Sequence, residues 1–376
     1  MNCDRQSRAP ECLVPHLPGR VGTRRRWFAA LALLLGVALA LGVGEVLLRA
    51  VVNFQLLGSE DGFTRLMRQG PRETVDTVSG GRQIFRPSEH PDIGWEPIPR
   101  VEVGHIRINA GGFRGREYPP SPPPGVERIV VLGDSETFGF NLREEETFPS
   151  ILESRLNARG GRRFEALNFA APGYNTANQL AVLRKRAIRY RPGIVVLMYN
   201  FNDPEIGDPY LVLGRGLPSR SYLYLLAAYL HKRATALPDL RARARTAVEY
   251  YHLLHASPYG EASRRLVLEM ADFAQQHGAC CVLVIDPHIA DREPLGDKYP
   301  YRDIHARLAA LASESITVVD PLAALAAANP DPTVWWIGPY DRHKNAAAHA
   351  VIADCVAEVI LRGAETIPVS APTGPQ

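Results

Sequence analysis

The sequence is most informative at Arg128-Ile129-Val130-Val131-Leu132-Gly133-Asp134-Ser135. Its apolar run is short and rich in β-branched residues, which is typical of a strand buried in a parallel sheet. Polar residues follow at once, so we expect Ser135 at the carboxyl end of the strand, where open α/β sheets place their ligands. Ser135 is therefore a candidate nucleophile. The simpler alternative is a strand-to-helix turn in which it only caps the helix.

Four further apolar runs follow along the chain, and helical patterns separate them. They predict a strand and turn over 164–173 and strands over 194–199, 280–285 and 316–319. The predicted helices are one capped by Thr147 and ended by Gly160, then 175–191, 261–276, 301–312 and a last one from Asn345. Five strands alternating with helices favour a parallel sheet with helices on both faces.

An uncharged segment lies near the N-terminus, over residues 27–44. Eighteen helical residues span roughly 27 Å, close to the hydrocarbon core of a bilayer. Arg20, Arg24, Arg25 and Arg26 precede it, so the positive-inside rule places the N-terminus in the cytoplasm and the chain beyond about residue 50 outside it. A cleaved signal peptide is the alternative, since Ala38-Leu39-Ala40 resembles a cleavage site. The segment has no polar face, which argues against a soluble helix.

These patterns divide the chain into five parts. They are a cytoplasmic tail (1–26), a transmembrane helix (27–48), an extracytoplasmic extension (53–126), the α/β domain (127–365) and a disordered tail (366–376). Residues 205–257 interrupt the alternation, and an amphipathic helix is expected at 222–234. This insertion is interpreted as a lid or subdomain, or as an extra helical pair that does not contact substrate.

The composition excludes several classes of protein. A net charge of +3 over 376 residues does not indicate nucleic-acid binding, and the eleven histidines show no zinc-type spacing with cysteines. The five cysteines do not form a disulfide framework, so buried free thiols are expected, with a bridge to Cys355 as the alternative. The first strand lacks the Gly-x-Gly-x-x-Gly turn of dinucleotide-binding proteins. No cofactor and no metal are expected.

A candidate base lies near the end of the chain, where Asp341-Arg342-His343 precedes the last helix. These residues, and 335–340 before them, are expected to form a loop. A histidine two residues after a carboxylate can take the proton of Ser135 with one ring nitrogen while Asp341 holds the other.

Oxyanion donors are expected at the ends of neighbouring strands. Gly173 follows the second strand, where a bare backbone N–H can approach a ligand closely. Asn202 follows the third strand and carries a side-chain amide. The backbone N–H of Ser135 is the third candidate donor.

Taken in order, these blocks resemble the SGNH (GDSL-type) hydrolases: Gly133-Asp134-Ser135, Gly173, Asn202-Asp203 and Asp341-Arg342-His343. The resemblance covers about residues 127–365 and implies a flavodoxin-like three-layer α/β/α sandwich. It implies Ser135 as nucleophile, His343 as base and Asp341 as the acid that orients it. It also implies that Ser135, Gly173 and Asn202 form the oxyanion hole. The stretch 107–115 is similar to the segment ahead of the core in membrane-anchored bacterial members.

Three positions depart from the family pattern. Glu136 stands where many members carry an apolar residue, and no role is assigned to it. One residue separates Asp341 from His343 where two are common, a variant also found in relatives that move acyl groups between sugars. His349 follows an alanine where members often have glycine, and it is expected to be a helix residue. Asp203 is expected to brace the turn of Asn202.

The resemblance and the apolar segment together imply an extracytoplasmic serine esterase. Its expected substrates are acyl esters, acetyl esters above all, on a carbohydrate or another small molecule. One alternative is a glycan O-acyltransferase that uses the same triad and receives its acyl groups from a membrane partner. Another is a lipid esterase or lysophospholipase, and a third is a surface protein without enzymatic activity. Membrane attachment through the N-terminal helix is expected, and no nucleic-acid partner is.

Overall fold

The structure is a computed structural model. It describes residues 21–53, 84–206, 243–339 and 341–366, with the isolated residues 221, 223, 224, 226, 227 and 240. Residues 1–20 of the tail predicted at 1–26 and residues 367–376 of the tail predicted at 366–376 lie outside these residues, while residues 21–26 and 366 are helical. Cys3, Cys12 and most of the predicted helix at 222–234 also lie outside the described residues. The chain divides into two units, Met1–Ser59 and Glu60–Gln376.

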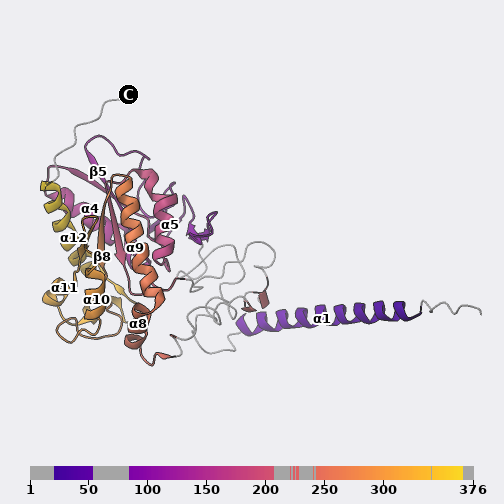
Figure 1. Cartoon of the computed structure of the whole chain (residues 1–376). Helices are drawn as coiled ribbons and strands as arrows, with labels where there is room; N and C mark the ends of the chain where they lie inside the picture. The colour runs from indigo at the N-terminus through magenta and orange to yellow at the C-terminus, as the bar shows by residue number, and fades with distance from the viewer. Residues whose placement is uncertain are drawn as a thin grey trace, which may run out of the picture. The chain divides into compact units, whose positions relative to one another are not determined.

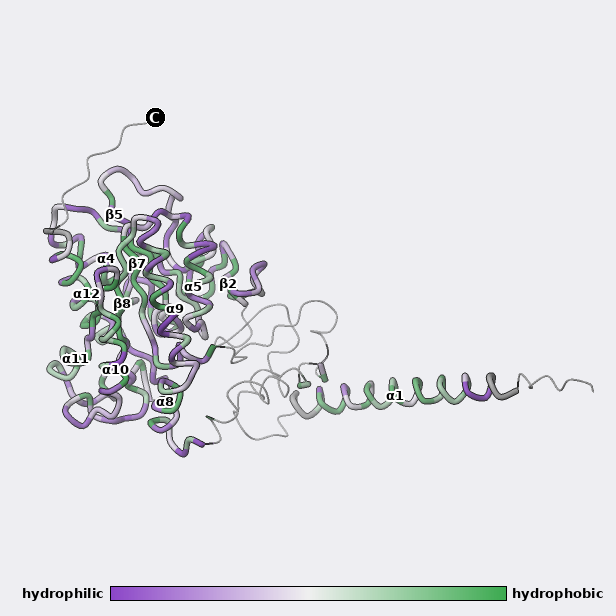
Figure 2. The backbone as a smooth tube through the Cα atoms, viewed as in Figure 1, coloured by the Kyte–Doolittle hydropathy of each residue, from purple (hydrophilic) through white to green (hydrophobic). Residues whose placement is uncertain are grey.

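The described part of the first unit is one helix, α1 (Val21–Asn53) (Figure 1). Within it, Arg25–Ala50 is long and apolar enough to cross a membrane, and its apolar side chains are exposed. Figure 2 shows apolar residues along most of its length. Glu45 and Arg49 form an i,i+4 ion pair at 2.8 Å, so the two charges near its end offset each other. A signal sequence would meet the same criteria of length and composition.

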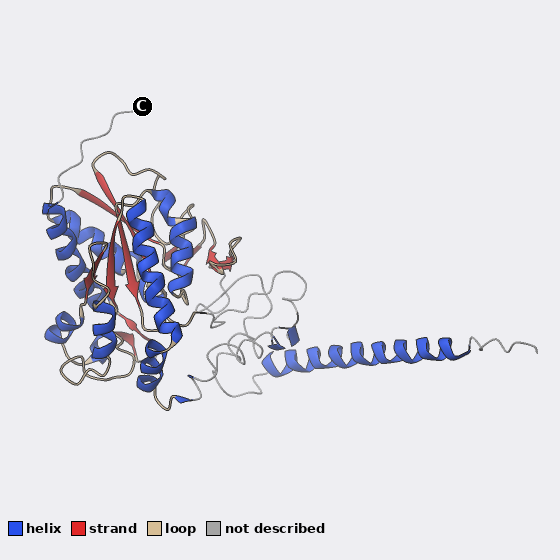
Figure 3. Cartoon of the chain, in the orientation of Figure 1, coloured by secondary structure: helices blue, strands red, loops and turns tan. Residues whose placement is uncertain are grey.

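The second unit is built on a five-stranded parallel sheet (Figure 3). Its strands are β5 (Val126–Leu132), β6 (Arg163–Asn168), β7 (Ile194–Tyr199), β8 (Cys280–Ile285) and β9 (Ile316–Val319). Their spatial order is β6-β5-β7-β8-β9, the flavodoxin-like order 2-1-3-4-5. β5 thus lies between β6 and β7, with Val130 opposite Leu167 and Val195. The five predicted strands are confirmed.

Helices cover both faces of the sheet, which confirms the predicted three-layer sandwich (Figures 1 and 3). On one face α4 (Phe148–Ala158) packs against α12 (Ala346–Thr366), and on the other α5 (Thr176–Lys185) packs against α9 (Pro258–Gln276). The shorter elements are α3 (Ser135–Phe138), η1 (Glu144–Glu146), η2 (Ala187–Tyr190), α8 (Ala247–Ala256), α10 (Arg302–Ala309), α11 (Leu322–Ala328) and η4 (Pro332–Trp335).

The segment ahead of β5 shares the core of the sheet. It forms two hairpins, β1 (Phe85–Pro87) with β2 (Trp95–Pro97), and β3 (Glu102–Val103) with β4 (Ile106–Arg107). Side chains such as Phe85 and Ile108 are buried in the same cluster as β5. Phe113 stacks on Phe169, just beyond β6, with ring centroids 4.3 Å apart. The described part of the extension therefore packs as part of the second unit.

The predicted loop around the candidate base is wrong. β10 (Trp336–Gly338) and β11 (Asp341–Lys344) form an antiparallel hairpin, in which Trp336 pairs with Lys344. The charged sequence of β11 lacks the apolar pattern of a strand. It pairs because β10 is anchored by the buried Trp336, whose indole N–H donates to the carbonyl of Ile289 at 3.1 Å.

Three smaller predictions also need correction. The helix predicted over 175–191 ends at Lys185 and continues as the 3₁₀ turn η2. Thr147 does precede α4, but its hydroxyl donates to the carbonyl of Glu144 at 2.8 Å and caps no helical N–H. The described cysteines are free, yet only Cys281 is buried, because Cys280 lies at the exposed start of β8 and Cys355 is half-buried.

A buried ion pair ties β5 to β6 at the end of the sheet away from Ser135. Arg128 is fully buried and donates to Glu165 at 2.6 Å and to the carbonyl of Tyr190 at 3.0 Å. We expect Arg128→Met to lower the free energy of unfolding by about 3–5 kcal/mol. The buried Glu165 carboxylate loses its 2.6 Å partner and keeps only Arg116, at 3.7 Å from its other oxygen. Urea unfolding followed by tryptophan fluorescence measures this.

The control is Arg162→Met, which breaks the partly exposed pair of Arg162 with Glu127 at 3.1 Å. A loss of less than about 1 kcal/mol is expected there, because solvent screens such pairs. Equal losses in the two variants would contradict the buried role of Arg128.

Candidate active site

Ser135 lies where β5 turns into α3. β5 ends at Leu132, and Asp134 caps α3 by accepting the N–H of Glu136 on Oδ1 at 3.0 Å. A Cβ at Gly133 would collide with the buried side chain of Thr137, so the turn requires glycine at that position. Ser135 therefore lies at the carboxyl edge of the sheet, as predicted.

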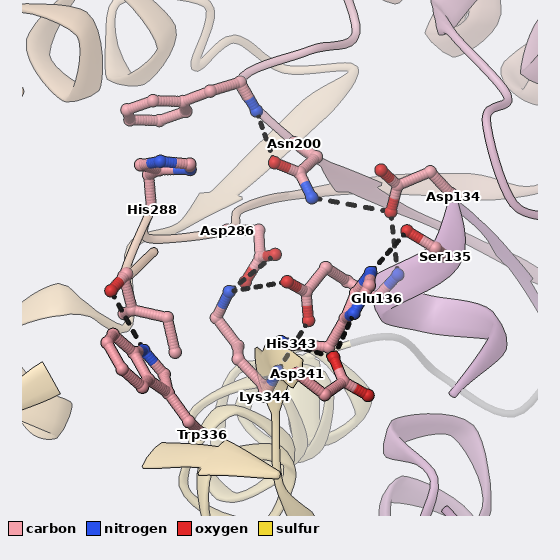
Figure 4. Close-up of polar contacts among 12 residues, drawn as sticks. Asp134, Ser135, Glu136, Asn200, Asp286, His288, Trp336, Asp341, His343 and Lys344 are labelled. Atoms are coloured by element: carbon pink, nitrogen blue, oxygen red, sulfur yellow. Dashed lines mark hydrogen bonds and ion pairs between the residues drawn. The ribbon is translucent and has the colours of Figure 1, made fainter. Parts of the chain in front are cut away.

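The structure brings Ser135, His343 and Asp341 together (Figure 4). His343 Nε2 lies 3.1 Å from Ser135 Oγ, and His343 Nδ1 lies 2.6 Å from Asp341 Oδ1. Asp341 and His343 occupy alternate positions of β11, and alternate residues of a strand face the same side. A single intervening residue is therefore the spacing that a strand requires for this pair, which explains the departure from the common family spacing.

Charge near His343 favours its protonated form. Burial lowers the pKa of the His343 imidazole, but the hydrogen bond with Asp341 and the charge of Glu136 outweigh it and raise the pKa to about 9. The same hydrogen bond with His343 lowers the pKa of the Asp341 carboxyl to about 2. Asp341 is therefore ionised at neutral pH and stabilises the imidazolium that forms when His343 takes a proton.

The predicted oxyanion residues follow the two strands that flank β5. Gly173 lies beyond β6 with φ at +75°, in a turn tied to the Ser135 loop by the N–H of Ala171 donating to the carbonyl of Gly133 at 3.3 Å. Asn202 lies beyond β7, in the turn closed by the N–H of Glu205 donating to its carbonyl at 2.9 Å. The sheet order therefore places both turns beside Ser135.

Two asparagines of the site were missed by sequence reasoning. Asn141 donates to Asp341 Oδ2, the oxygen that His343 does not use. Asn200 donates to Asp134 Oδ1 at 3.5 Å and accepts the N–H of Phe201 at 2.7 Å (Figure 4). Asn200 follows β7 directly, so its place at a strand end was a usable signal. Nothing in the local sequence marks Asn141, which meets Asp341 from 200 residues away.

The segment ahead of β5 braces the loops of the site. The buried guanidinium of Arg114 donates to the carbonyls of Phe138 at 2.7 Å and Leu142 at 2.6 Å, and so holds the loop that carries Asn141. The indole N–H of Trp95 donates to the carbonyl of Pro172 at 3.0 Å, next to Gly173. These contacts give the extension a direct structural role at the site.

Two polar residues that the sequence placed outside the triad lie beside it. His349 is buried on α12 and accepts the N–H of Phe148 on Nδ1 at 2.8 Å; burial lowers its pKa to about 4. Asp203 is buried, accepts the amide of Gln179 at 3.1 Å and donates its N–H to the carbonyl of Asn200 at 3.0 Å. Asp203 thus braces the turn of Asn202, as expected.

The arrangement suits acyl transfer through a serine. His343 can accept the hydroxyl proton of Ser135 while Asp341 holds the ring. Within the described ranges, no group of three or more His, Cys, Asp or Glu side chains is placed to hold a metal ion.

Known proteins share parts of this chain. An arylesterase of Vibrio mimicus is 31% identical over 91 residues, which are 24% of this chain and 45% of that protein, so the match spans less than half of the relative. A member of the lipolytic protein G-D-S-L family from Veillonella parvula is 14% identical, with a TM-score of 0.40, over 63% of this chain and 99% of that one. A catalytic mutant of an acetylxylan esterase from Geobacillus stearothermophilus is 18% identical, with a TM-score of 0.39, over 62% and 94%.

The family assignment comes from a longer match. Residues 131–351, more than half of the chain, match the model of the GDSL-like Lipase/Acylhydrolase family. The matched segment begins inside β5 and ends inside α12, so it includes the sheet, the Ser135 turn and the β10–β11 hairpin. This chain therefore belongs to the GDSL-like lipase/acylhydrolase family, the SGNH-type hydrolases.

Proposed function

We propose that this protein is a serine esterase whose triad is Ser135, His343 and Asp341. The observation that carries the proposal is the continuous chain of contacts, 3.1 Å from Ser135 Oγ to His343 Nε2 and 2.6 Å from His343 Nδ1 to Asp341 Oδ1. Residues 341 and 343 lie more than 200 positions from Ser135 in the chain, and the fold brings them together. His343 contacts both Ser135 and Asp341, as a base must when it deprotonates a nucleophile and is oriented by an acid.

The reaction proceeds in two transfers. His343 Nε2 takes the Ser135 proton as Oγ attacks the ester carbonyl, and the oxyanion is bound by the N–H groups of Ser135 and Gly173 and the amide of Asn202. When the C–O bond breaks, His343 returns the proton to the departing alcohol, which leaves an acyl-serine. Water activated by His343 then releases the acid and restores Ser135.

We propose acetyl esters of a carbohydrate as the substrate class. The exposed fraction of the His343 side chain is 44%, so the base is open to solvent and a bulky alcohol can approach it. The partial similarity to an arylesterase supports ester hydrolysis. The candidate membrane span in α1, preceded by arginines, supports a membrane-anchored enzyme with its catalytic domain outside the cytoplasm.

Ester hydrolysis by the full-length protein in detergent tests the nucleophile. We expect Ser135→Ala to lower kcat on p-nitrophenyl acetate by about 10³-fold or more, because the acyl-serine cannot form. Ser313→Ala, at an exposed serine, is the control and should leave kcat unchanged.

Equal activity of wild type and Ser135→Ala would refute the serine mechanism. Faster turnover of octanoyl than acetyl esters would instead favour a lipid esterase. A Ser135-dependent burst that continues only with added sugar acceptor would favour an acyltransferase.

The pH profile tests the base. His343 must be neutral to accept a proton, and with its pKa near 9 only about one imidazole in a hundred is neutral at pH 7. We therefore expect kcat/KM to rise with pH, to reach half of its maximum near pH 9 and to level off only above that pH. Asp341→Asn weakens the hydrogen bond that contributes most to raising the His343 pKa, so the rise of kcat/KM should move to lower pH. We also expect kcat to fall by about 10⁴-fold, as the matching substitution does in another serine hydrolase fold. A profile that is flat from pH 5 to 9 would exclude His343 as the base.

Thiol labelling tests the topology. Cys280 is exposed, whereas Cys281 is buried and burial raises its pKa to about 12, so Cys280 is the more reactive thiol of the pair. In a variant with Cys3→Ser and Cys12→Ser, a membrane-impermeant maleimide should label cells with an intact cytoplasmic membrane. Cys280→Ser in that background should abolish most of the labelling. Labelling that requires lysis of the membrane would place the domain in the cytoplasm.

A further inference from the structure

A second contact joins the segments that carry Ser135 and His343. Glu136 follows Ser135, Lys344 follows His343, and the N–H of Lys344 donates to Glu136 Oε2 at 3.0 Å. This contact lies beside the 3.1 Å contact between Ser135 and His343 (Figure 4). The start of α3 and the end of β11 are therefore linked at two consecutive positions.

The side chain of Lys344 adds a second connection between β11 and Glu136. Its Nζ lies 3.0 Å from Asp286 Oδ2, just beyond β8, and 3.7 Å from Glu136 Oε1. The exposed fractions of the Lys344 and Asp286 side chains are 3% and 1%, and that of Glu136 is 13%. Two carboxylates and one ammonium thus share a nearly dry site directly beside the triad.

We propose that Glu136 is a positioning residue for the base, which clamps β11 to α3 and places a negative charge beside the His343 imidazole. Lys344 and Asp286 hold the Glu136 carboxylate in position. This inference rests on the proposed function, since it assigns to Glu136 a role in the action of His343. Glu136 itself need not touch the substrate.

The geometric part of the role follows from the weakness of the β10–β11 hairpin. β10 has three residues and β11 has four, and the pairing between them is irregular. An isolated two-stranded hairpin is marginally stable. The bond from the Lys344 N–H to Glu136 therefore contributes to holding His343 within reach of Ser135. Without an acceptor, the N–H of the buried Lys344 would lose its partner, which is itself unfavourable.

The electrostatic part follows from the charges around His343. Asp341 faces it on β11, Glu136 and Asp134 face it from α3 and its cap, Asp286 lies at the end of β8, and Lys344 and His349 complete the surroundings. Burial opposes the charged form of Glu136, but the ammonium of Lys344 and the nearby His343 outweigh it, so the pKa of Glu136 is lowered. Glu136 is therefore ionised at the pH where His343 acts, and its charge favours the imidazolium.

Two substitutions in the full-length protein separate these roles. Glu136→Gln keeps an oxygen acceptor for the Lys344 N–H and removes the charge. We expect the acid limb of kcat/KM to move about one unit toward lower pH, because one of the charges that raise the His343 pKa is lost. Glu136→Ala removes acceptor and charge, and we expect the same shift with kcat lower by about 100-fold, since a misplaced base loses the productive geometry.

The matched control is Glu165→Gln. Glu165 is also a buried carboxylate in an ion pair, at 2.6 Å from Arg128, but it lies on β6 away from the triad. This variant should lower the unfolding midpoint and leave the acid limb of the kcat/KM profile at its wild-type pH. Circular dichroism of each variant confirms that the fold is retained.

The outcomes distinguish this inference from the proposed esterase function. If Ser135→Ala abolishes hydrolysis while Glu136→Gln keeps the wild-type limb and Glu136→Ala keeps the wild-type kcat, the role of Glu136 is refuted and the triad stands. If Ser135→Ala retains activity, the esterase mechanism fails, and the role of Glu136 fails with it. If Glu136→Gln keeps the acid limb of the kcat/KM profile but lowers the unfolding midpoint, Glu136 has only a structural role.

Discussion

The pairing of β5 with both β6 and β7 is the constraint on which the site depends. Residues 129–132 of β5 are fully buried. Burial of each large apolar side chain contributes about 1.5–3 kcal/mol, so this strand is held firmly in register. Because the three strands are parallel, their carboxyl ends meet at one edge. The sheet thus brings the turns that carry Ser135, Gly173 and Asn202 to the same edge.

The base reaches this edge in a different way. His343 comes from a short hairpin near the end of the chain, and the sheet does not contain it. Its position depends on polar contacts with α3, made by Ser135 and Glu136 and by Asn141 just beyond. Such contacts are individually modest, about 1 kcal/mol when neutral and more when charged. Several of them together position a base that its own strand would hold poorly.

The segment ahead of β5 gives the site its rigidity. The guanidinium of Arg114 donates to carbonyl groups at the end of α3 and just beyond it. The indole of Trp95 donates to the carbonyl of Pro172, in the turn before Gly173. A buried guanidinium is costly unless its donors are used, so Arg114 also requires that loop to keep its conformation. The extension and the catalytic loops therefore stabilise each other.

Local patterns in the sequence were sufficient for the five strands and for most of the helices, and together with the family resemblance they pointed to Ser135, His343 and Asp341, which the fold brings together. Apolar runs and strand-end turns are properties of neighbouring residues, so they can be recognised in the sequence alone. The hairpin of β10 and β11, the support from Arg114 and Asn141, and the cluster of Glu136, Lys344 and Asp286 had no such signature. The partners of Arg114, Asn141 and Lys344 lie 24 to 208 residues away along the chain. A charged residue looks the same in sequence whether it faces solvent or a buried partner, and only the packed structure distinguishes the two, because burial removes the water that would otherwise solvate its charge.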